Sequence, residues 1–456
     1  MNEIKADGKT IGLIYFSLST GGIQRGASFL IPQFVAWGYK VVVLTVVDPT
    51  PEEYDVKCDY VRVGLGHHAV APLEKALKIR AARMEKAVRD HHIDLVIHHS
   101  PYSLPLLTQD VDLLHRLGVK VVVHWHSVFS DKYVRGDQQL NAAAFYDVCR
   151  RLAGLITLSH TDATAFTLLG CRACCIPYAD VDLLPNWTRP AAAPAPEIVW
   201  IGRFWDVKKP LDAVKIVERL LDRMPTAHLT LLGRGDPGTL RRVRAYVANH
   251  SRLAKAVTFA GFQRDVTPFL KSAGVGLLTS RFEGYCHSLV EMKMAGLPAV
   301  VYAMPYLDTA QPDTGVVSVP QDDVAAAADA IAAVLNDADR YARLSREART
   351  AYEKIAAFDS ATAYRDFFDR VFNEKPMPPV DMGAERLGIV LRTFVEHAHG
   401  GFRDMEARCL PYERRLPQLL LRPYLWLRKY VRIWRDEGWY GFKVRIGLRF
   451  GRREEA

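Results

Sequence analysis

Residues 10–47 read TIGLIYFSLSTGGIQRGASFLIPQFVAWGYKVVVLTVV, and this stretch decides the fold class. The apolar run TIGLIYFS predicts a buried strand, which the loop LSTGGIQRG follows. An apolar helix pattern extends from Ala27 to Trp37 and stops at Gly38, and a second apolar run, KVVVLTVV, comes next. The stretch therefore predicts a strand, a helix and a second strand in the order that α/β proteins use.

The same alternation continues along the chain as far as residue 160. Strand patterns occur at 94–100, 120–127 and 155–160, with helical patterns near 104–117 and 142–152. Strands that are apolar throughout are typical of parallel sheets, because helices cover both faces of such sheets. We therefore expect a doubly wound α/β domain over residues 1–188.

A change of composition marks the end of this domain. Residues 189–197, RPAAAPAPE, follow neither the strand nor the helix period, so we interpret them as a linker between two domains. The alternation then restarts with the strand patterns IVWIGRF, HLTLLGRG, AVTFAG, VGLLTS and PAVVYA. These patterns predict a second α/β domain over residues 198–374. Its last helix, YRDFFDRVFNE, closes this domain or returns to the first one.

A third segment, residues 381–456, follows the proline-rich boundary KPMPPV and is basic and mostly helical in pattern. The whole chain has a formal net charge of +9, and residues 408–453 hold 13 basic and 3 acidic side chains. Over 424–436 a helical pattern separates aromatic and aliphatic side chains from basic ones. Such a helix can lie on an anionic membrane surface, or it can pack on the protein's own core. The sequence leaves both readings open and favours nucleic acid least.

The composition and the cysteines indicate a cytoplasmic protein. Hydrophobic residues make up 49% of the 456 residues, which is enough for large buried cores. The N-terminal stretch MNEIKADGKTIGLIYFS is too short and too acidic for a secretion signal, and no apolar run approaches the roughly 18 to 20 residues of a membrane-spanning helix. Seven scattered cysteines, an odd number, favour reduced thiols. We expect a cytoplasmic location, with the basic segment as the candidate peripheral contact to the inner face of the cell membrane.

Glycine pairs follow two of the predicted strands. Gly21 and Gly22 lie in STGGIQRG, and Gly233 and Gly235 lie in LLGRGD. At the carboxyl end of a parallel strand such glycines let the backbone approach a phosphate or a sugar. Each pair is equally consistent with a plain turn, so neither identifies a ligand by itself.

Two cations lie close together in the loop IGRFWDVKKP. Arg203 and Lys208 both follow a predicted strand. An arginine fork together with a lysine ammonium suits a diphosphate group. A solvated basic loop would have the same sequence, and the loop alone does not distinguish the two.

The stretch SRFEGYCHSLVEMKMAGLP, residues 280–298, contains two carboxylates. It predicts a loop that carries Glu283 and a helix, YCHSLVEMKMA, that carries Glu291 and ends before Gly296. If the whole interval were helical, the two residues would be separated by roughly 12 Å, so the carboxylates cannot share one proton. We expect them to hold one elongated ligand at two places.

The start of this helix lies between the two glutamates. The backbone N–H groups of Cys286, His287 and Ser288 are expected there, and a helix N-terminus favours an anion. A nucleotide diphosphate fits the whole arrangement, with its phosphates at the helix end and one glutamate for each flanking sugar.

The segment GRFWDVKKP, followed by SRFEGYCHSLVEMKMAGLPAV, resembles the retaining nucleotide-sugar glycosyltransferases of family 4. The similarity extends over residues 11–373 and is densest over 198–336, where G-R-x4-K, a G-x-G turn and E-x7-E occur in this order. It implies the GT-B architecture, in which two Rossmann-like domains with parallel sheets face each other.

The resemblance also implies roles for the candidate residues. Arg203 and Lys208 would neutralise the diphosphate as it leaves. Glu291 would hold the ribose hydroxyls, and Glu283 would contact the donor sugar. Gly22, from the opposite domain, would approach the diphosphate or the sugar.

A histidine beside the donor sugar is implied as well. His126, in VVVHWHS, matches this position, and His124 lies on the same face of the strand, so either could serve. The resemblance implies no cofactor and no metal, since arginine and lysine take the place of a divalent ion and no D-x-D motif is evident. The chain departs from many relatives at Lys209, where they carry a glycine, and at Cys286 and His287, where they carry small or apolar residues.

The implied function is retaining transfer of a sugar from a nucleotide diphosphate, with UDP-sugars favoured. The acceptor would be a glycan or a lipid-linked precursor in cell-surface polysaccharide or glycolipid biosynthesis. A catalytically silent scaffold of the same fold, partner to an active transferase, is a different class, and the intact Arg203, Lys208, Glu283 and Glu291 argue against it. An NAD-dependent oxidoreductase is disfavoured, because STGGIQRG does not contain G-x-G-x-x-G.

Overall fold

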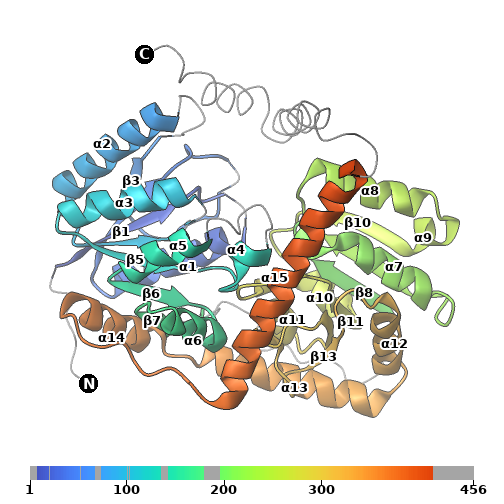
Figure 1. The fold of residues 1–456 in the computed structure, drawn as a ribbon. Coiled ribbons are helices and arrows are strands. Elements are labelled where there is room, and N and C mark those ends of the chain that lie inside the picture. Colours follow the sequence, from blue (N-terminus) through green and yellow to red (C-terminus); the bar gives the residue numbers. More distant parts are fainter. Residues whose placement is uncertain are drawn as a thin grey trace. The chain divides into compact units, whose positions relative to one another are not determined.

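The computed structural model describes residues 8–19, 21–51, 53–66, 73–99, 101, 103–134, 142–178 and 196–413. The chain divides into two compact units (Figure 1). Unit 1 consists of Met1–Thr157, Asp162–Ile176 and Ala361–Ala456, and unit 2 consists of Leu158–Thr161 and Pro177–Ser360. Most of the predicted linker at 189–197 lies outside the described residues.

Unit 1 is built on a parallel sheet with the strand order β3-β2-β1-β4-β5-β6-β7. In chain order the strands are β1 Thr10–Tyr15, β2 Lys40–Thr45, β3 Val61–Gly64, β4 Leu95–His98, β5 Lys120–His124, β6 Gly154–Thr157 and β7 Ala173–Cys175. The helices that go with them are α1 Gly22–Ala36, α2 Leu73–His91, α3 Leu104–Arg116, α4 Asp131–Val134, α5 Ala142–Arg150 and α6 His160–Leu168. The reversal of direction between β1 and β4 is the doubly wound topology that the sequence predicts.

The central and the edge strands of this sheet differ in how clearly the sequence marks them. Every residue of β1 is buried, as its continuous apolar run predicts. β3 and β7 were not predicted. They lie at the two edges, where β3 exposes Val61 and Gly64 and β7 has only three residues. Short, partly solvated strands leave little periodic signal in a sequence.

Unit 2 is built on a second parallel sheet with the order β10-β9-β8-β11-β12-β13. Its strands are β8 Glu197–Ile201, β9 His228–Leu232, β10 Val257–Gly261, β11 Val275–Leu278, β12 Ala299–Tyr302 and β13 Val316–Val319. Its helices are η3 Asp206–Lys208, α7 Pro210–Leu220, α8 Pro237–Ala248, α9 Ser251–Ala256, α10 Thr267–Ser272, α11 His287–Met294, η4 Asp308–Ala310, α12 Val324–Leu335 and α13 Ala338–Ala356. The predicted class is confirmed, because both units are Rossmann-like α/β units with parallel sheets.

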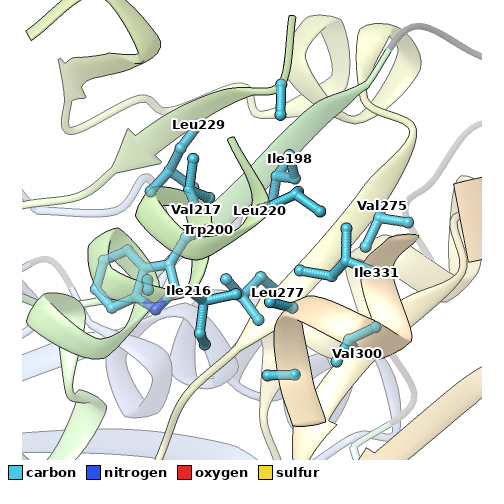
Figure 2. Close-up of a cluster of buried hydrophobic side chains, with 14 of the residues drawn as sticks. Ile198, Trp200, Ile216, Val217, Leu220, Leu229, Val275, Leu277, Val300 and Ile331 are labelled. Atoms are coloured by element: carbon cyan, nitrogen blue, oxygen red, sulfur yellow. The ribbon is translucent and has the colours of Figure 1, made fainter. Parts of the chain in front are cut away.

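The core of unit 2 lies between its sheet and the helices α7 and α12 (Figure 2). Ile198 and Trp200 of β8 meet Val217 of α7 and Ile331 of α12, and all four are at most 1% exposed. The apolar residues of α7 recur with helical spacing, so one face of the helix is buried against the sheet. This packing fixes the strand ends from which the candidate site is built.

The helix α14, Ser360–Phe372, packs against α1. The ring centroid of Phe34 lies 5.1 Å from that of Tyr364 and 5.6 Å from that of Phe368. These contacts group α14 with unit 1.

The last described element is α15, Ala384–Glu413, which packs on α4. Ser130 Oγ and His397 Nδ1 lie 2.7 Å apart, and Thr164 Oγ1 donates to the Asp381 carbonyl at 3.0 Å. The predicted basic helix at 424–436 lies outside the described residues. Within the part of the chain that the structure describes, no helix combines the length and hydropathy needed to cross a membrane.

Candidate functional site

The loops that follow β8 and β11 carry the cations and the first carboxylate predicted for unit 2. Arg203 is exposed, and its guanidinium lies 5.9 Å from the ring centroid of Trp205. Lys208 ends η3 and is half-buried, whereas Glu283 is buried. Both loops leave the carboxyl ends of neighbouring parallel strands, which is where ligands bind in open α/β sheets.

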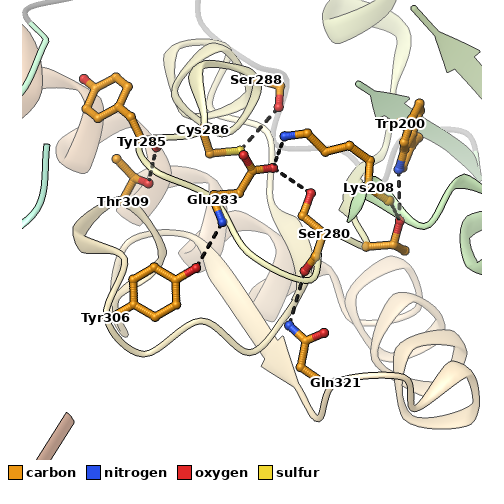
Figure 3. A network of polar contacts seen from close by, with 11 residues as sticks. Trp200, Lys208, Ser280, Glu283, Tyr285, Cys286, Ser288, Tyr306, Thr309 and Gln321 are labelled. Atoms are coloured by element: carbon orange, nitrogen blue, oxygen red, sulfur yellow. Dashed lines mark hydrogen bonds and ion pairs between the residues drawn. The ribbon is translucent and has the colours of Figure 1, made fainter. Parts of the chain in front are cut away.

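Lys208 and Glu283 form an ion pair (Figure 3). The lysine Nζ donates to Oε1 of the carboxylate, and Ser280 Oγ donates to the same oxygen at 2.6 Å. Both of these hydrogen bonds end on Oε1, and no other side chain in the described part of the chain donates to Oε2 of Glu283. Oε2 is therefore the oxygen that can accept a hydrogen bond from a ligand hydroxyl.

The backbone around Glu283 is fixed from two sides. Its N–H donates to the Tyr306 hydroxyl at 3.0 Å, and the Arg281 N–H donates to the Val207 carbonyl at 2.8 Å. The second bond ties the loop after β11 to the loop after β8. It keeps Lys208 and Glu283 together although they are far apart in the sequence. Because the pair is largely buried, removing one partner would leave the other charge uncompensated.

The helix that carries Glu291 begins later than predicted. α11 starts at His287 rather than at Tyr285, because Cys286 has φ 66° and ψ 69° and cannot continue a right-handed helix. The interval between Glu283 and Glu291 is therefore not one helix, so the helical rise does not give the separation of the two carboxylates. Glu291 lies within α11, as predicted, and is buried.

Cys286, His287 and Ser288 surround the start of α11. Cys286 Sγ lies 3.4 Å from Ser288 Oγ. Burial, together with the neighbouring Glu283 carboxylate, raises the pKa of the Cys286 thiol to about 12, so this group is a neutral thiol at neutral pH. The ring of His287 lies 5.0 Å from that of Tyr178, which gives this histidine an aromatic neighbour.

The glycines after β9 have a packing role in unit 2. A Cβ atom at Gly233 would lie 1.9 Å from the Gly202 carbonyl oxygen, and one at Gly235 would lie 2.5 Å from the Phe204 nitrogen. Gly233 also has φ 135°, which other residues rarely adopt. The two loops touch backbone to backbone, so both positions need glycine whatever the ligand. A role of these glycines in donor binding stays a prediction.

In unit 1 the first glycine pair lies at the start of α1. Gly21 is the N-cap and Gly22 the first residue of this 15-residue helix, which begins earlier than the predicted Ala27. The helix follows the loop after β1, and its N-terminal N–H groups favour an anion at that place.

Three histidines of unit 1 lie together at the ends of β4 and β5. His99 Nδ1 and His126 Nε2 are 3.0 Å apart, and the ring centroids of His124 and His126 are 4.3 Å apart. His99 and His124 are fully buried, whereas His126 is partly exposed. Of the two histidines left open by the sequence, His126 is thus the one that a ligand can reach.

Burial keeps the inner histidines neutral. It lowers the pKa of His124 to about 3 and that of His99 well below its usual range. The neighbouring His124 and His98 lower the pKa of His99 further. One ring nitrogen from each of His99, His124 and His126 lies within 4.8 Å of the other two. Neutral imidazole is the form that binds zinc, so this cluster could hold a metal ion.

The sequence patterns did not identify His99 as a member of this histidine cluster. His99 directly follows β4, which pairs in parallel with β5. The two adjacent strand patterns, each ending in histidines, were the available signal. The expectation that the protein needs no metal stays a prediction.

Two family models match the chain, one in each half. The model described as Glycosyltransferase Family 4 matches residues 20–187, and the model described as Glycosyl transferases group 1 matches residues 195–337. Between them they span most of both α/β units.

Curated relatives share parts of this sequence. The Vi polysaccharide biosynthesis protein VipC/TviE of Salmonella typhi is 32% identical over 100 residues, which are 22% of this chain and 17% of that protein. Glycogen synthase of Mycobacterium tuberculosis is 31% identical over 182 residues, which are 38% of this chain and 43% of that protein. The chain thus matches less than half the length of these relatives.

Solved structures share the fold over most of the chain. Sucrose-phosphate synthase of Thermosynechococcus elongatus has a TM-score of 0.64 at 18% identity, and the match covers 80% of this chain and 100% of that one. HepE of Anabaena, in complex with UDP-glucose, has a TM-score of 0.63 at 15% identity, with 80% and 99% covered. At such identities the likeness shows the fold alone, which is GT-B. The two family models, which together cover well over half of the chain, show that it belongs to the family 4 glycosyltransferases.

Proposed function

We propose that the protein is a retaining glycosyltransferase that moves a sugar from a nucleotide diphosphate to a hydroxyl group of a glycan or lipid-linked acceptor. The observation that carries the proposal is the Lys208–Glu283 pair, which joins the loop after β11 to the loop after β8 that also holds Arg203. Two cations on one loop suit a diphosphate, and a carboxylate with an available oxygen suits a sugar hydroxyl. A nucleotide-sugar offers these two groups side by side.

The chemistry needs few protein groups. The bond between C1 of the donor sugar and the diphosphate oxygen breaks, and a bond from C1 to the acceptor oxygen forms on the same face. The proton of the acceptor hydroxyl passes to the departing diphosphate, so no protein nucleophile is required. The neutral thiol of Cys286 agrees with this. The main task of the protein is then to stabilise the charge of the leaving group.

Four residues of the site in unit 2 have roles in this scheme. Arg203 and Lys208 would neutralise the diphosphate as negative charge develops on it. Glu283 would accept a hydrogen bond from the donor sugar through Oε2, and Glu291 would hold the ribose hydroxyls.

The donor and the acceptor are proposed from the relatives. HepE was solved with UDP-glucose, and a TarM mutant from S. aureus was solved with UDP, which favours a UDP-sugar here. The relative from Vi polysaccharide biosynthesis favours a cell-surface glycan as the product. We place the protein in the cytoplasm, with the basic segment 381–456 as its contact to the inner face of the membrane.

Hydrolysis and transfer assays with a panel of UDP-, GDP- and ADP-sugars test the proposal on the full chain. Release of nucleotide from one class of donor, with the anomeric configuration of the product retained by NMR, is the expected result. Binding of UDP without release from any donor would instead favour the silent scaffold. Inversion at C1 would contradict the proposed mechanism.

A further inference from the structure

Three non-glycine residues with left-handed backbone conformations lie around the Lys208–Glu283 pair. Lys209 (φ 44°) directly follows Lys208, Cys286 (φ 66°) precedes α11, and Asp322 (φ 67°) follows β13. Residues with a Cβ adopt this conformation at a cost in free energy, so it persists where other contacts fix it. Lys209 and Asp322 are joined to each other by an ion pair.

The Lys209 side chain makes the contacts that fix its backbone. Besides the ion pair with Asp322, its Nζ donates to Gln321 Oε1 at 3.2 Å and lies 5.4 Å from the ring centroid of Tyr302. The Lys209 side chain is 17% exposed, whereas that of Asp322 is 69% exposed, so the lysine is the inner partner. A glycine at this position would adopt the backbone conformation without strain but could make none of these contacts.

Gln321 lies where three loops of the sheet edge meet. Its Nε2 donates to the carbonyl oxygens of Ser280 at 3.2 Å, Arg281 at 3.3 Å and Ala303 at 3.1 Å, and Figure 3 shows the first of these bonds. Its Oε1 accepts from Lys209. One amide group thereby joins the loops that follow β8, β11 and β12.

Thr279 also links the two loops that carry the ion pair, in addition to Gln321 and the Arg281–Val207 bond. Thr279 Oγ1, at the end of β11, donates to the carbonyl oxygens of Lys208 at 2.8 Å and Lys209 at 3.0 Å. The same oxygen accepts from Trp200 Nε1 of β8 at 3.0 Å. Because the carbonyl of Lys208 itself is held, a shift of either loop would move its side chain relative to Glu283.

We propose that Lys209 and Gln321 form a brace that positions Lys208 and Glu283 for the donor. This inference rests on the proposed transferase function. Glutamine suits the position, because its amide has an acceptor oxygen for Lys209 and two donor hydrogens, one of which is shared between two of the three carbonyl oxygens. Glutamate could not donate to the three carbonyls, and leucine could neither donate nor accept.

A brace of this kind acts on the reaction more than on binding. Correct placement of charged groups contributes where charge develops, in the transition state, so its loss lowers kcat more than it raises KM. Lys209 and Gln321 act through Lys208 and Glu283, so they are positioning residues.

Kinetics of three variants test the brace. We expect Lys209→Met and Gln321→Leu each to lower kcat for donor turnover by about 10- to 100-fold with a smaller change in KM. The double variant is expected to be no slower than the slower single variant, since both changes break one unit. Arg223→Met, which removes the ion pair between the turn after α7 and Asp329 of α12, is the matched control and keeps its turnover. A rise in KM at unchanged kcat, or fully additive losses, would overturn the brace.

Hydrogen exchange separates failure of the brace from failure of the proposed function. The Arg281 N–H donates to the Val207 carbonyl, so its exchange reports directly on the docking of the two loops. We expect peptides over 279–284 to exchange about 10-fold faster in Gln321→Leu and Lys209→Met, with β9 unchanged. If the wild-type protein turns over no donor, the proposed function fails, and the exchange result alone then decides the brace. Unchanged exchange over 279–284 in Gln321→Leu would overturn it.

Discussion

At the scale of single residues, Lys208 and Glu283 neutralise each other's charge in the protein without a ligand. The carboxylate is almost fully buried and the lysine mostly so, and each holds the other in place. On binding of a donor, phosphate oxygens would compensate Lys208, and a sugar hydroxyl would donate to Oε2 of Glu283. The Lys208–Glu283 ion pair would then be replaced by charge-assisted hydrogen bonds from each residue to the donor.

Glu283→Gln tests the need for the negative charge. The amide has nearly the same shape, but it cannot compensate the Lys208 ammonium, so we expect kcat to fall about 10²- to 10³-fold while the protein stays folded. Steady-state kinetics and circular dichroism provide the measurement. Glu353→Gln, which removes an exposed carboxylate paired with Arg349, is the control. Equal activity of the two variants would show that the Glu283 charge has no role in turnover.

The buried thiol at the start of α11 gives a second prediction at this scale. Because burial raises the pKa of Cys286 to about 12, iodoacetamide at about pH 8 is expected to leave it unmodified in the native protein. The partly exposed Cys58 is expected to react, and in urea both cysteines should react. Mass spectrometry of the alkylated peptides distinguishes them. Modification of native Cys286 as fast as Cys58 would contradict the assignment of a neutral, enclosed thiol.

The sequence predicted the residue types at the edge of the sheet but not their contacts. Arg203, Lys208 and Glu283 were placed after strands correctly, since glycine and charge patterns follow the apolar runs. The pairing of Lys208 with Glu283 could not be predicted, because it depends on β8 and β11 being neighbours in the sheet. Gln321 gave no signal of its own, since a single glutamine after an unpredicted strand has no periodicity.

At the scale of elements, α11 contains a lysine among its buried residues. Lys293 is 1% exposed, and its Nζ donates to the Thr314 carbonyl. Burial lowers the pKa of the Lys293 ammonium to about 7, from 10.5 in an unperturbed side chain. The same helix carries Glu291, so its stability bears on the candidate site.

Lys293→Met is predicted to change how stability depends on pH. Below pH 7 the lysine is protonated in both the folded and the unfolded state, so the cost of burying its charge is fully present. Between pH 7 and 10.5 the unfolded chain binds more protons at this position than the folded protein does, so the lysine destabilises the fold less as the pH rises. Urea unfolding at about pH 6.5 and about pH 9 should therefore show a larger advantage of Lys293→Met at the lower pH. An equal difference at both pH values would contradict the shifted pKa.

The sequence was a good guide to the central elements and a poor one to edges and helix starts. Strands with long apolar runs, such as β1 and β2, were predicted, whereas the four-residue edge strand β13 was missed. The start of α11 was misplaced because Cys286 is left-handed. Residue type does not predict this conformation for a cysteine, since neighbouring contacts impose it.

At the scale of the whole molecule, the last part of the chain grouped with unit 1 holds the helix α15 and, after it, the basic residues 414–456. Truncation after residue 413 keeps α15, which packs on α4, and removes 414–456. We expect the full chain to co-sediment with anionic liposomes more than this truncation does, because a basic segment is attracted to anionic lipid. Neutral liposomes are the control. Equal partitioning of both proteins would show that residues 414–456 do not contribute to membrane binding.

The account's central claim is that cations on the loop after β8 stabilise a departing nucleotide diphosphate. Turnover of the preferred nucleotide-sugar by Arg203→Ala, Lys208→Ala and the control Lys255→Ala, an exposed lysine of α9, tests it most directly. The account predicts that the first two variants each lose about 10²- to 10³-fold in kcat and that the control keeps wild-type activity. Near-wild-type turnover in both Arg203→Ala and Lys208→Ala would contradict it.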